Sequence, residues 1–205
     1  MAPMPIKIAL NQFIDFTNSM GVKRISIARD FLSEPYSPQT DFYRPLRRAI
    51  EDFHQGGEKH ERILTDLPNQ LQDKKKRASY PALISAYLGF IKRHSVRRIR
   101  KSPRWSWEAH GLEVNINPEL AVEIDGVPHI VKLWLRTEKI DRHRLPAVLA
   151  MMHQSLGTEK TIRIGVLDVR RKKLHVYTTS KPYVMILLRN EARALAGMLE
   201  EMRGL

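Results

Sequence analysis

The chain has 205 residues, 42% of them hydrophobic, so it is long enough to bury a sizeable core. Lys and Arg number 35 against 22 Asp and Glu, and the formal charge of +13 favours nucleic acid over a membrane surface as partner. Because cysteine is absent, disulfides, thiolate metal sites and a cysteine nucleophile are excluded. We expect a cytoplasmic protein, since the sequence shows neither a secretory signal nor about eighteen consecutive apolar residues.

The first third of the chain has the pattern of helices. Apolar residues recur in a largely helical rhythm over residues 5–19, and Met20-Gly21 ends that run. The same criteria predict three further helices, at residues 22–32, 42–53 and 63–71. We interpret residues 1–79 as a helical elaboration that precedes the main domain.

The remainder of the chain mixes helices and strands. Pro81 suits the first turn of a helix whose apolar stripe continues towards Val96 and Ile99. A later helix is predicted between a capping Asp141 and a terminating Gly157. Strands are expected at 105–115, 120–124 and 129–136 and on both sides of a basic turn at 170–173, and a closing helix at 183–203.

The segment Asn117–Arg136 predicts a β-hairpin. Leu120, Val122 and Ile124 alternate with other residues before the turn, and apolar residues alternate again after it. Asp125-Gly126 tolerates the positive φ angles that a two-residue hairpin turn needs. We therefore expect 120–124 to pair antiparallel with 129–136.

Pro118-Glu119, followed by this hairpin and a polar residue in an apolar strand, resembles the PD-(D/E)XK nuclease superfamily. In that family a Pro-Asp begins the second core strand, and an acid-any-Lys triplet follows on the third strand. Glu119 matches the first acid. The triplet falls on Lys132-Leu133-Trp134, where Lys replaces the second acid and Trp the lysine; a shift of two residues, to Ile130-Val131-Lys132, keeps the lysine but still lacks the acid.

The resemblance covers roughly residues 80–180 and implies an α/β fold. Its expected form is a restriction-endonuclease-like α-β-β-β-α-β core with a mixed sheet, and the predicted order of helix, three strands, helix and strand from Pro81 to Asp168 agrees with it. We assign residues 80–205 to this core together with the C-terminal helix.

The candidate catalytic residues are Glu113, Glu119 and Lys132, which alternation could bring together at one end of the sheet. Glu113 and Glu119 would bind Mg²⁺ only if the protein is an enzyme, with Lys132 stabilising charge on the scissile phosphate. The alternative is a salt bridge between Glu119 and Lys132, in which the lysine occupies the space of the metal. We favour this alternative, because an ammonium repels a divalent ion at short range.

From Lys74 to Arg104 the chain has eleven Lys or Arg residues and no acid. The functional interpretation is contact with phosphates, in which counterion release makes binding depend on salt. The alternative is a solvated basic helix face, and Trp105 either stacks on unpaired bases or completes a core. The predicted nucleic-acid-binding residues are Lys92, Arg93, Arg97, Arg98, Arg100, Lys101, Arg104, Trp105, Arg170, Arg171, Lys172 and Lys173.

The sequence thus predicts a DNA- or RNA-binding protein with a nuclease-like fold, a degenerate catalytic centre and no cofactor. The first alternative is a divalent-metal nuclease that uses Mg²⁺. The second is a non-catalytic interaction module, which leaves open a protein partner or a second copy of the chain.

Overall fold

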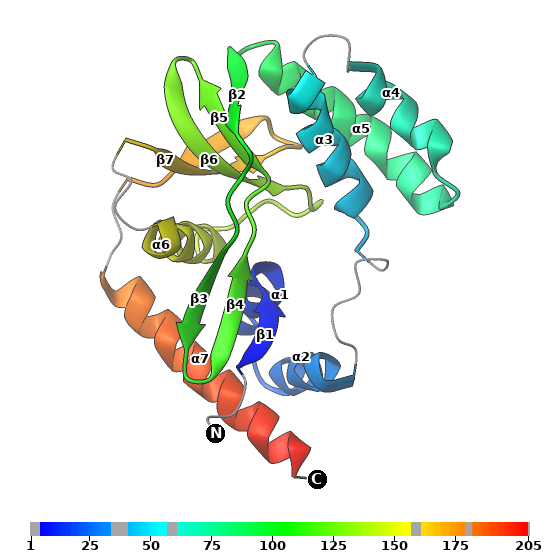
Figure 1. Cartoon of the computed structure of the whole chain (residues 1–205). Coiled ribbons are helices and arrows are strands. Elements are labelled where there is room, and N and C mark those ends of the chain that lie inside the picture. Colours follow the sequence, from blue (N-terminus) through cyan, green and yellow to red (C-terminus); the bar gives the residue numbers. More distant parts are fainter. Residues whose placement is uncertain (1–4, 34–40, 57–60, 157–160, 179–181, 205) are drawn as a thin grey trace.

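A computed structural model describes residues 5–33, 41–56, 61–156, 161–178 and 182–204 (Figure 1). Its strands form two sheets, one of five strands and one of three. In the described part of the chain, none of the helices has the length and apolarity needed to cross a membrane.

The five-stranded sheet has the order β2-β5-β6-β7-β8. Neighbouring strands in this order pair antiparallel, except β6 and β7, which are parallel. Along the chain, helix α5 precedes β2, two strands of the other sheet (Trp105–Ala109 and Leu112–Ile116) lie between β2 and β5, and helix α6 connects β6 to β7. Within this sheet, α5-β2-β5-β6-α6-β7 has the expected α-β-β-β-α-β order. The predicted fold class is confirmed. The elements are α5 (Lys74–Ile91), β2 (Val96–Arg100), β5 (Leu120–Ile124), β6 (Val127–Trp134), α6 (Arg144–Leu156), β7 (Arg163–Asp168) and β8 (Lys173–Val176).

The hairpin predicted from the Asp-Gly pair is present as β5 and β6. Asp125 and Gly126 have φ angles of 50° and 80°, as a two-residue turn of this kind requires. Leu120 pairs with Val131, and Ile124 with Val127. This register sets which residues of β5 and β6 lie opposite one another, and so positions the polar residues of the site described below.

Two apolar clusters cover the two faces of the five-stranded sheet. On one face, Leu120, Val122 and Leu133 pack with residues of α5, α3 (Arg44–Gly56) and α4 (Glu61–Gln70). On the other face, Ala121 and Ile130 pack with α6. The second cluster also includes helices α1 (Leu10–Thr17), α2 (Val22–Ser33) and α7 (Pro182–Arg203), which lie in the lower half of Figure 1.

The three-stranded sheet corrects two predictions. The strand expected at 105–115 is a hairpin of β3 (Trp105–Ala109) and β4 (Leu112–Ile116), with positive φ at His110 and Gly111. Residues 6–9, expected to be helical, form strand β1 parallel to β4. Only from Leu10 onwards does the segment become a helix. The apolar pattern of residues 5–19 did not reveal this switch, because the partner strand of β1 lies about a hundred residues away.

Helix α5 corrects a third prediction. It begins at Lys74, where the Asp73 side chain caps it by accepting hydrogen bonds from the backbone N–H groups of Lys75 (2.8 Å) and Lys76 (3.1 Å). Pro81 therefore lies inside the helix, which ends at Ile91. Val96 and Ile99 belong to strand β2, so β2 is the first strand of the core. The boundary predicted between residues 79 and 80 falls within α5, and the division into two regions stays a prediction.

Candidate nucleic-acid interface

Glu119 and Lys132 meet at the edge of the β5–β6 pairing. Lys132 Nζ lies 2.7 Å from Glu119 Oε1 and also donates to the carbonyl oxygen of Asn117 at 3.0 Å. The other carboxylate oxygen, Oε2, accepts the backbone N–H of Leu133 at 2.7 Å. Both side chains are buried. The salt bridge expected as the alternative to a metal site is therefore present.

Helix α3 brings a second cation to Glu119. Arg47 Nε lies 3.6 Å from Glu119 Oε1, and its guanidinium also pairs with Asp41. On the other side, Ser102 donates a hydrogen bond of 2.7 Å to the carbonyl oxygen of Pro118. The segment after β2 is thereby held against the residue that precedes Glu119.

A cavity of about 170 Å³ lies beside this ion pair, between α3 and the β2–β5 pair. Most of its lining is polar. The charged and polar side chains are Glu51, His54 and Gln55 from α3, Arg98 and Arg100 from β2, Lys101 and Ser102 after β2, and Glu119.

Glu51 is one of the cavity residues that were not predicted from the sequence, together with His54, Gln55 and Ser102. Burial raises the pKa of its carboxyl group, and the charge of Glu119 raises it further, so the two acids are close neighbours. A signal was available: Arg47, Glu51 and His54 have i, i+4 and i+7 spacing, which gives α3 one polar stripe. Only the fold shows that this stripe faces Glu119.

Glu113 does not join Glu119 and Lys132. It lies on β4 in the three-stranded sheet, opposite Glu108, and pairs with Lys7 at 3.2 Å. The expected convergence of Glu113 with Glu119 is thus wrong, because the strand that carries Glu113 belongs to another sheet. Within the described ranges, no three His, Cys, Asp or Glu residues are grouped to hold a metal ion.

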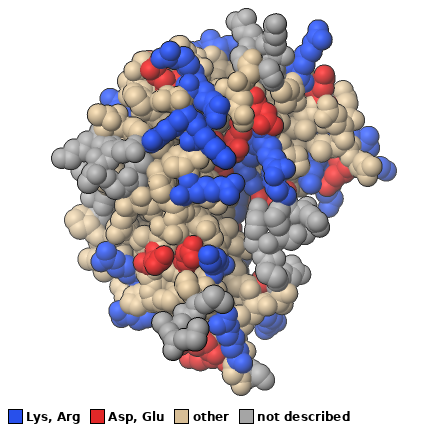
Figure 2. Space-filling view, in the orientation of Figure 1, with Lys and Arg blue, Asp and Glu red and all other residues tan. Residues whose placement is uncertain are grey.

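Lys and Arg side chains gather over β2 and the segment that follows it, with a few acidic side chains between them (Figure 2). Arg97, Arg98 and Arg100 are exposed on β2, which forms an edge of the five-stranded sheet, and Lys101 and Arg104 are exposed just after it. These five residues are called the basic face below. The sequence placed Arg97, Arg98 and Arg100 on a helix, and their position on strand β2 is a correction.

Other parts of the basic block lie elsewhere. Lys74–Arg77 begin α5, whose 18 residues make a helix about 27 Å long at the usual rise per residue. Lys92 and Arg93 follow the far end of this helix and are exposed. The acid-free block of the sequence is therefore divided between two ends of one helix.

Most basic residues of the predicted turn at 170–173 make contacts that stabilise the fold. Arg171 pairs with the fully buried Asp168 at 3.2 Å, and Arg170 donates to the carbonyl oxygen of Leu135 at 3.3 Å. Lys172 packs against α5, where an added Cβ at Gly89 would lie 2.7 Å from its Nζ. Lys173, the last residue of the turn, is exposed.

The two tryptophans of β3 contribute to packing. Trp107 is buried, and its Nε1 donates to Gln154 Oε1 at 2.9 Å. Trp105 is half-buried and packs against the same core cluster. This arrangement agrees with the core alternative for Trp105, and stacking on bases stays a prediction.

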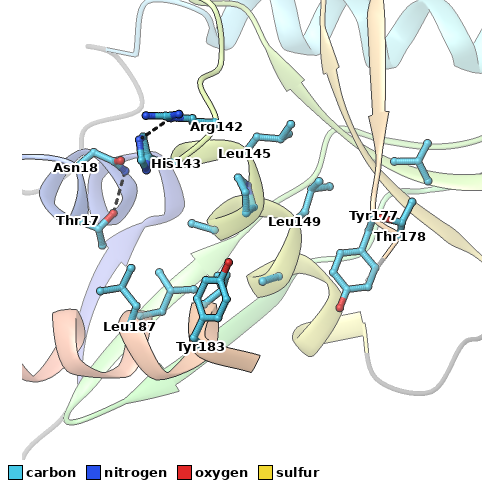
Figure 3. Close-up of a pocket in the computed structure, with 16 residues that line it drawn as sticks. Thr17, Asn18, Arg142, His143, Leu145, Leu149, Tyr177, Thr178, Tyr183 and Leu187 are labelled. Atoms are coloured by element: carbon cyan, nitrogen blue, oxygen red, sulfur yellow. Dashed lines mark hydrogen bonds between the residues drawn. The ribbon is translucent and has the colours of Figure 1, made fainter. Parts of the chain in front are cut away.

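A larger cavity of about 650 Å³ lies between α6, α7 and the end of β8 (Figure 3). Its lining includes Leu145, Leu149 and Leu187, with Arg142 and His143 at one side, where Arg142 Nε lies 3.2 Å from His143 Nε2. No described lining residue is an acid. Its chemistry therefore differs from that of the cavity beside Glu119.

Neither a protein-family model nor a curated protein matches the chain. Among solved structures, it is similar to the crystal structure of a protein from Eubacterium rectale described as a "putative exonuclease", with a TM-score of 0.51 and 11% sequence identity. The match covers 96% of this chain and 82% of the other. At this identity the likeness establishes a nuclease-like fold, and function has to be argued from the site.

Proposed function

We propose that the protein binds DNA or RNA through its basic face, on a degenerate PD-(D/E)XK fold that does not cleave its ligand. The observation that carries this proposal is the position of the basic face beside Glu119, where a nuclease of this fold would hold its metal. Phosphate contacts from Arg and Lys supply most sequence-independent affinity for nucleic acid. The nuclease-like fold supports the same class of ligand.

The groups around Glu119 do not fit a divalent metal. One carboxylate oxygen accepts a hydrogen bond from Lys132 and the other from the N–H of Leu133, so each already has a donor where a metal ligand would need an open position. Two cationic side chains, from Lys132 and Arg47, already lie within 4 Å of this carboxylate and would repel a further cation. Metal-assisted hydrolysis is therefore not part of the proposed function.

The proposal is tested by fluorescence anisotropy with labelled single-stranded DNA, duplex DNA and RNA over a series of salt concentrations. We expect binding without strong sequence preference. Neutralising four cations of the basic face should weaken it and flatten the plot of log K against log[salt] by up to about 0.9 per lost contact for duplex DNA. The test variant is Arg97→Gln, Arg98→Gln, Arg100→Gln and Lys101→Gln.

The matched control removes the same number of charges outside the basic face, from exposed positions. The control variant should keep most of the parent's affinity for nucleic acid, and this affinity should depend on salt more steeply than that of the test variant. Equal isotherms for the parent and the test variant would show that the basic face serves solubility instead. The control variant is Lys74→Gln, Lys75→Gln, Arg77→Gln and Arg203→Gln.

A further inference from the structure

The cavity beside Glu119 is large enough for one chemical group of a ligand but too small to hold a whole ligand. Its volume is about 170 Å³, whereas pockets for small molecules usually start at about 300 Å³. One water molecule takes about 30 Å³ of liquid. The space therefore suits a phosphate group with a few water molecules and is too small to enclose a complete nucleotide.

The strand side of the cavity is cationic. Arg98, Arg100 and Lys101 line it, and a register shift in the β2–β5 pairing falls between the two arginines. Such β-bulges re-aim side chains and are frequent beside functional sites. Arginine is well suited to phosphate, since its planar group can donate two parallel hydrogen bonds to the oxygens.

Arg98 pairs with Val122 on β5, and Val122 packs on the face of the sheet that α3 covers, so Arg98 lies on the α3 side. Arg98 and His54 both line the cavity. Burial, together with the positive charge of Arg98, lowers the pKa of His54 to about 4. His54 itself is neutral at pH 7, and its ring Nε2 is hydrogen-bonded to the hydroxyl group of Tyr87.

The acids of the cavity do not cancel this positive charge. Glu119 is neutralised by Lys132 and approached by Arg47. Glu51 is half-buried, and the raised pKa of its carboxyl group means that ionisation is disfavoured there. Among the described lining residues, Arg98 and Lys101 are thus set against the partly buried Glu51, whose ionisation is disfavoured, and this balance favours an anion.

We propose that this cavity seats one phosphate group of a nucleic-acid strand, held by Arg98 and Lys101 without a divalent cation. This inference rests on the proposed function and narrows it to a defined contact. Lys132 contributes to the site by neutralising Glu119, which would otherwise repel the phosphate. The phosphate can come from a strand end or from the backbone, which the experiment distinguishes.

In the first measurement, the protein is titrated with inorganic phosphate in the presence of EDTA, and binding is monitored by ³¹P NMR. We expect saturable binding. Arg98→Gln should weaken it by about tenfold or more, because a hydrogen-bonded charge pair is lost. Arg97→Gln is the matched control: it removes the same charge one residue away, and Arg97 pairs with Glu123 on β5 at 3.0 Å. It should change the affinity by less than about twofold.

The second measurement uses one oligonucleotide sequence with a 5′-phosphate, a 3′-phosphate or hydroxyl ends, again in EDTA. Preference for one phosphorylated end that disappears in Arg98→Gln identifies a strand end as the ligand. Equal affinity for all three, with Arg98→Gln much weaker than Arg97→Gln, identifies a backbone phosphate.

Two results would overturn the inference. In one, oligonucleotides bind but Arg98→Gln and Arg97→Gln weaken binding equally and inorganic phosphate does not bind; the proposed function then stands without the phosphate cavity. In the other, phosphate binds only when Mg²⁺ is added. If phosphate binds through Arg98 but no oligonucleotide does, the proposed function fails and the cavity is a site for free phosphate or a small phosphate ester.

Discussion

Lys132 Nζ lies 2.7 Å from Oε1 of Glu119, and both side chains are buried at the edge of the β5–β6 hairpin. The stability of a buried ion pair depends on its geometry, because each charge has lost its contacts with water and is stabilised by the other charge instead. The backbone N–H of Leu133 completes the environment of the carboxylate. This pair therefore acts as a fixed, nearly neutral element in a cationic cavity.

Lys132→Met should lower the free energy of unfolding by about 3 kcal/mol, since it leaves a buried carboxylate with only Arg47 nearby. The double variant Glu119→Gln/Lys132→Met should recover most of this loss, because neither charge then remains. Urea denaturation of the parent, the single variant and the double variant measures both effects. A loss below about 1 kcal/mol for Lys132→Met would show that the pair is effectively solvated.

Glu51→Gln should stabilise the protein at pH 7. The folded-state pKa of Glu51 is raised by burial and by Glu119, so its contribution to stability is full below its usual pKa near 4.5 and is lost as pH rises through the folded-state pKa. The gain from the substitution should therefore be present at pH 7 and vanish below about pH 4.5. Thermal unfolding from pH 4 to pH 7 measures it.

The control for Glu51 is Asp66→Asn, which removes the same charge from an exposed position on α4. If Asp66→Asn reproduces the full pH-dependent gain, the effect comes from the overall charge of the protein and not from the proximity of Glu51 to Glu119.

Arg171→Gln should reduce stability by about 2 kcal/mol, because the fully buried Asp168 loses a charged hydrogen-bond partner whose own side chain is partly exposed. Any loss of nucleic-acid affinity in that variant would follow from local unfolding. Lys173→Gln, an exposed change in the same turn, should leave stability within about 0.5 kcal/mol. Equal stabilities for the two variants would contradict a structural role for Arg171.

The sequence predicted the local parts of this fold well. The β5–β6 hairpin follows from strict alternation around Asp125-Gly126, and helices such as α2 and α7 follow from apolar spacing. The pairing of Glu119 with Lys132 could be foreseen, because hairpin register is set by the turn itself. These features depend on residues close together in the chain.

Features set by distant partners were not predictable. Strand β1 is defined by its pairing with β4, and its four residues carry too little pattern to separate strand from helix. Strand β2 has three arginines on an edge, so it lacks the alternation that marks a strand. Glu51 meets Glu119 only because α3 packs over the sheet.

In the proposed function, the basic face binds nucleic acid beside a centre that does not cleave it. The most direct test is to incubate purified protein with labelled single-stranded, duplex and branched substrates in Mg²⁺, Mn²⁺ or EDTA, and to measure binding and cleavage in the same samples. We predict salt-sensitive binding of similar strength in Mg²⁺ and EDTA, with the substrates intact. Metal-dependent cleavage that disappears in Glu119→Ala would contradict this account and establish a nuclease.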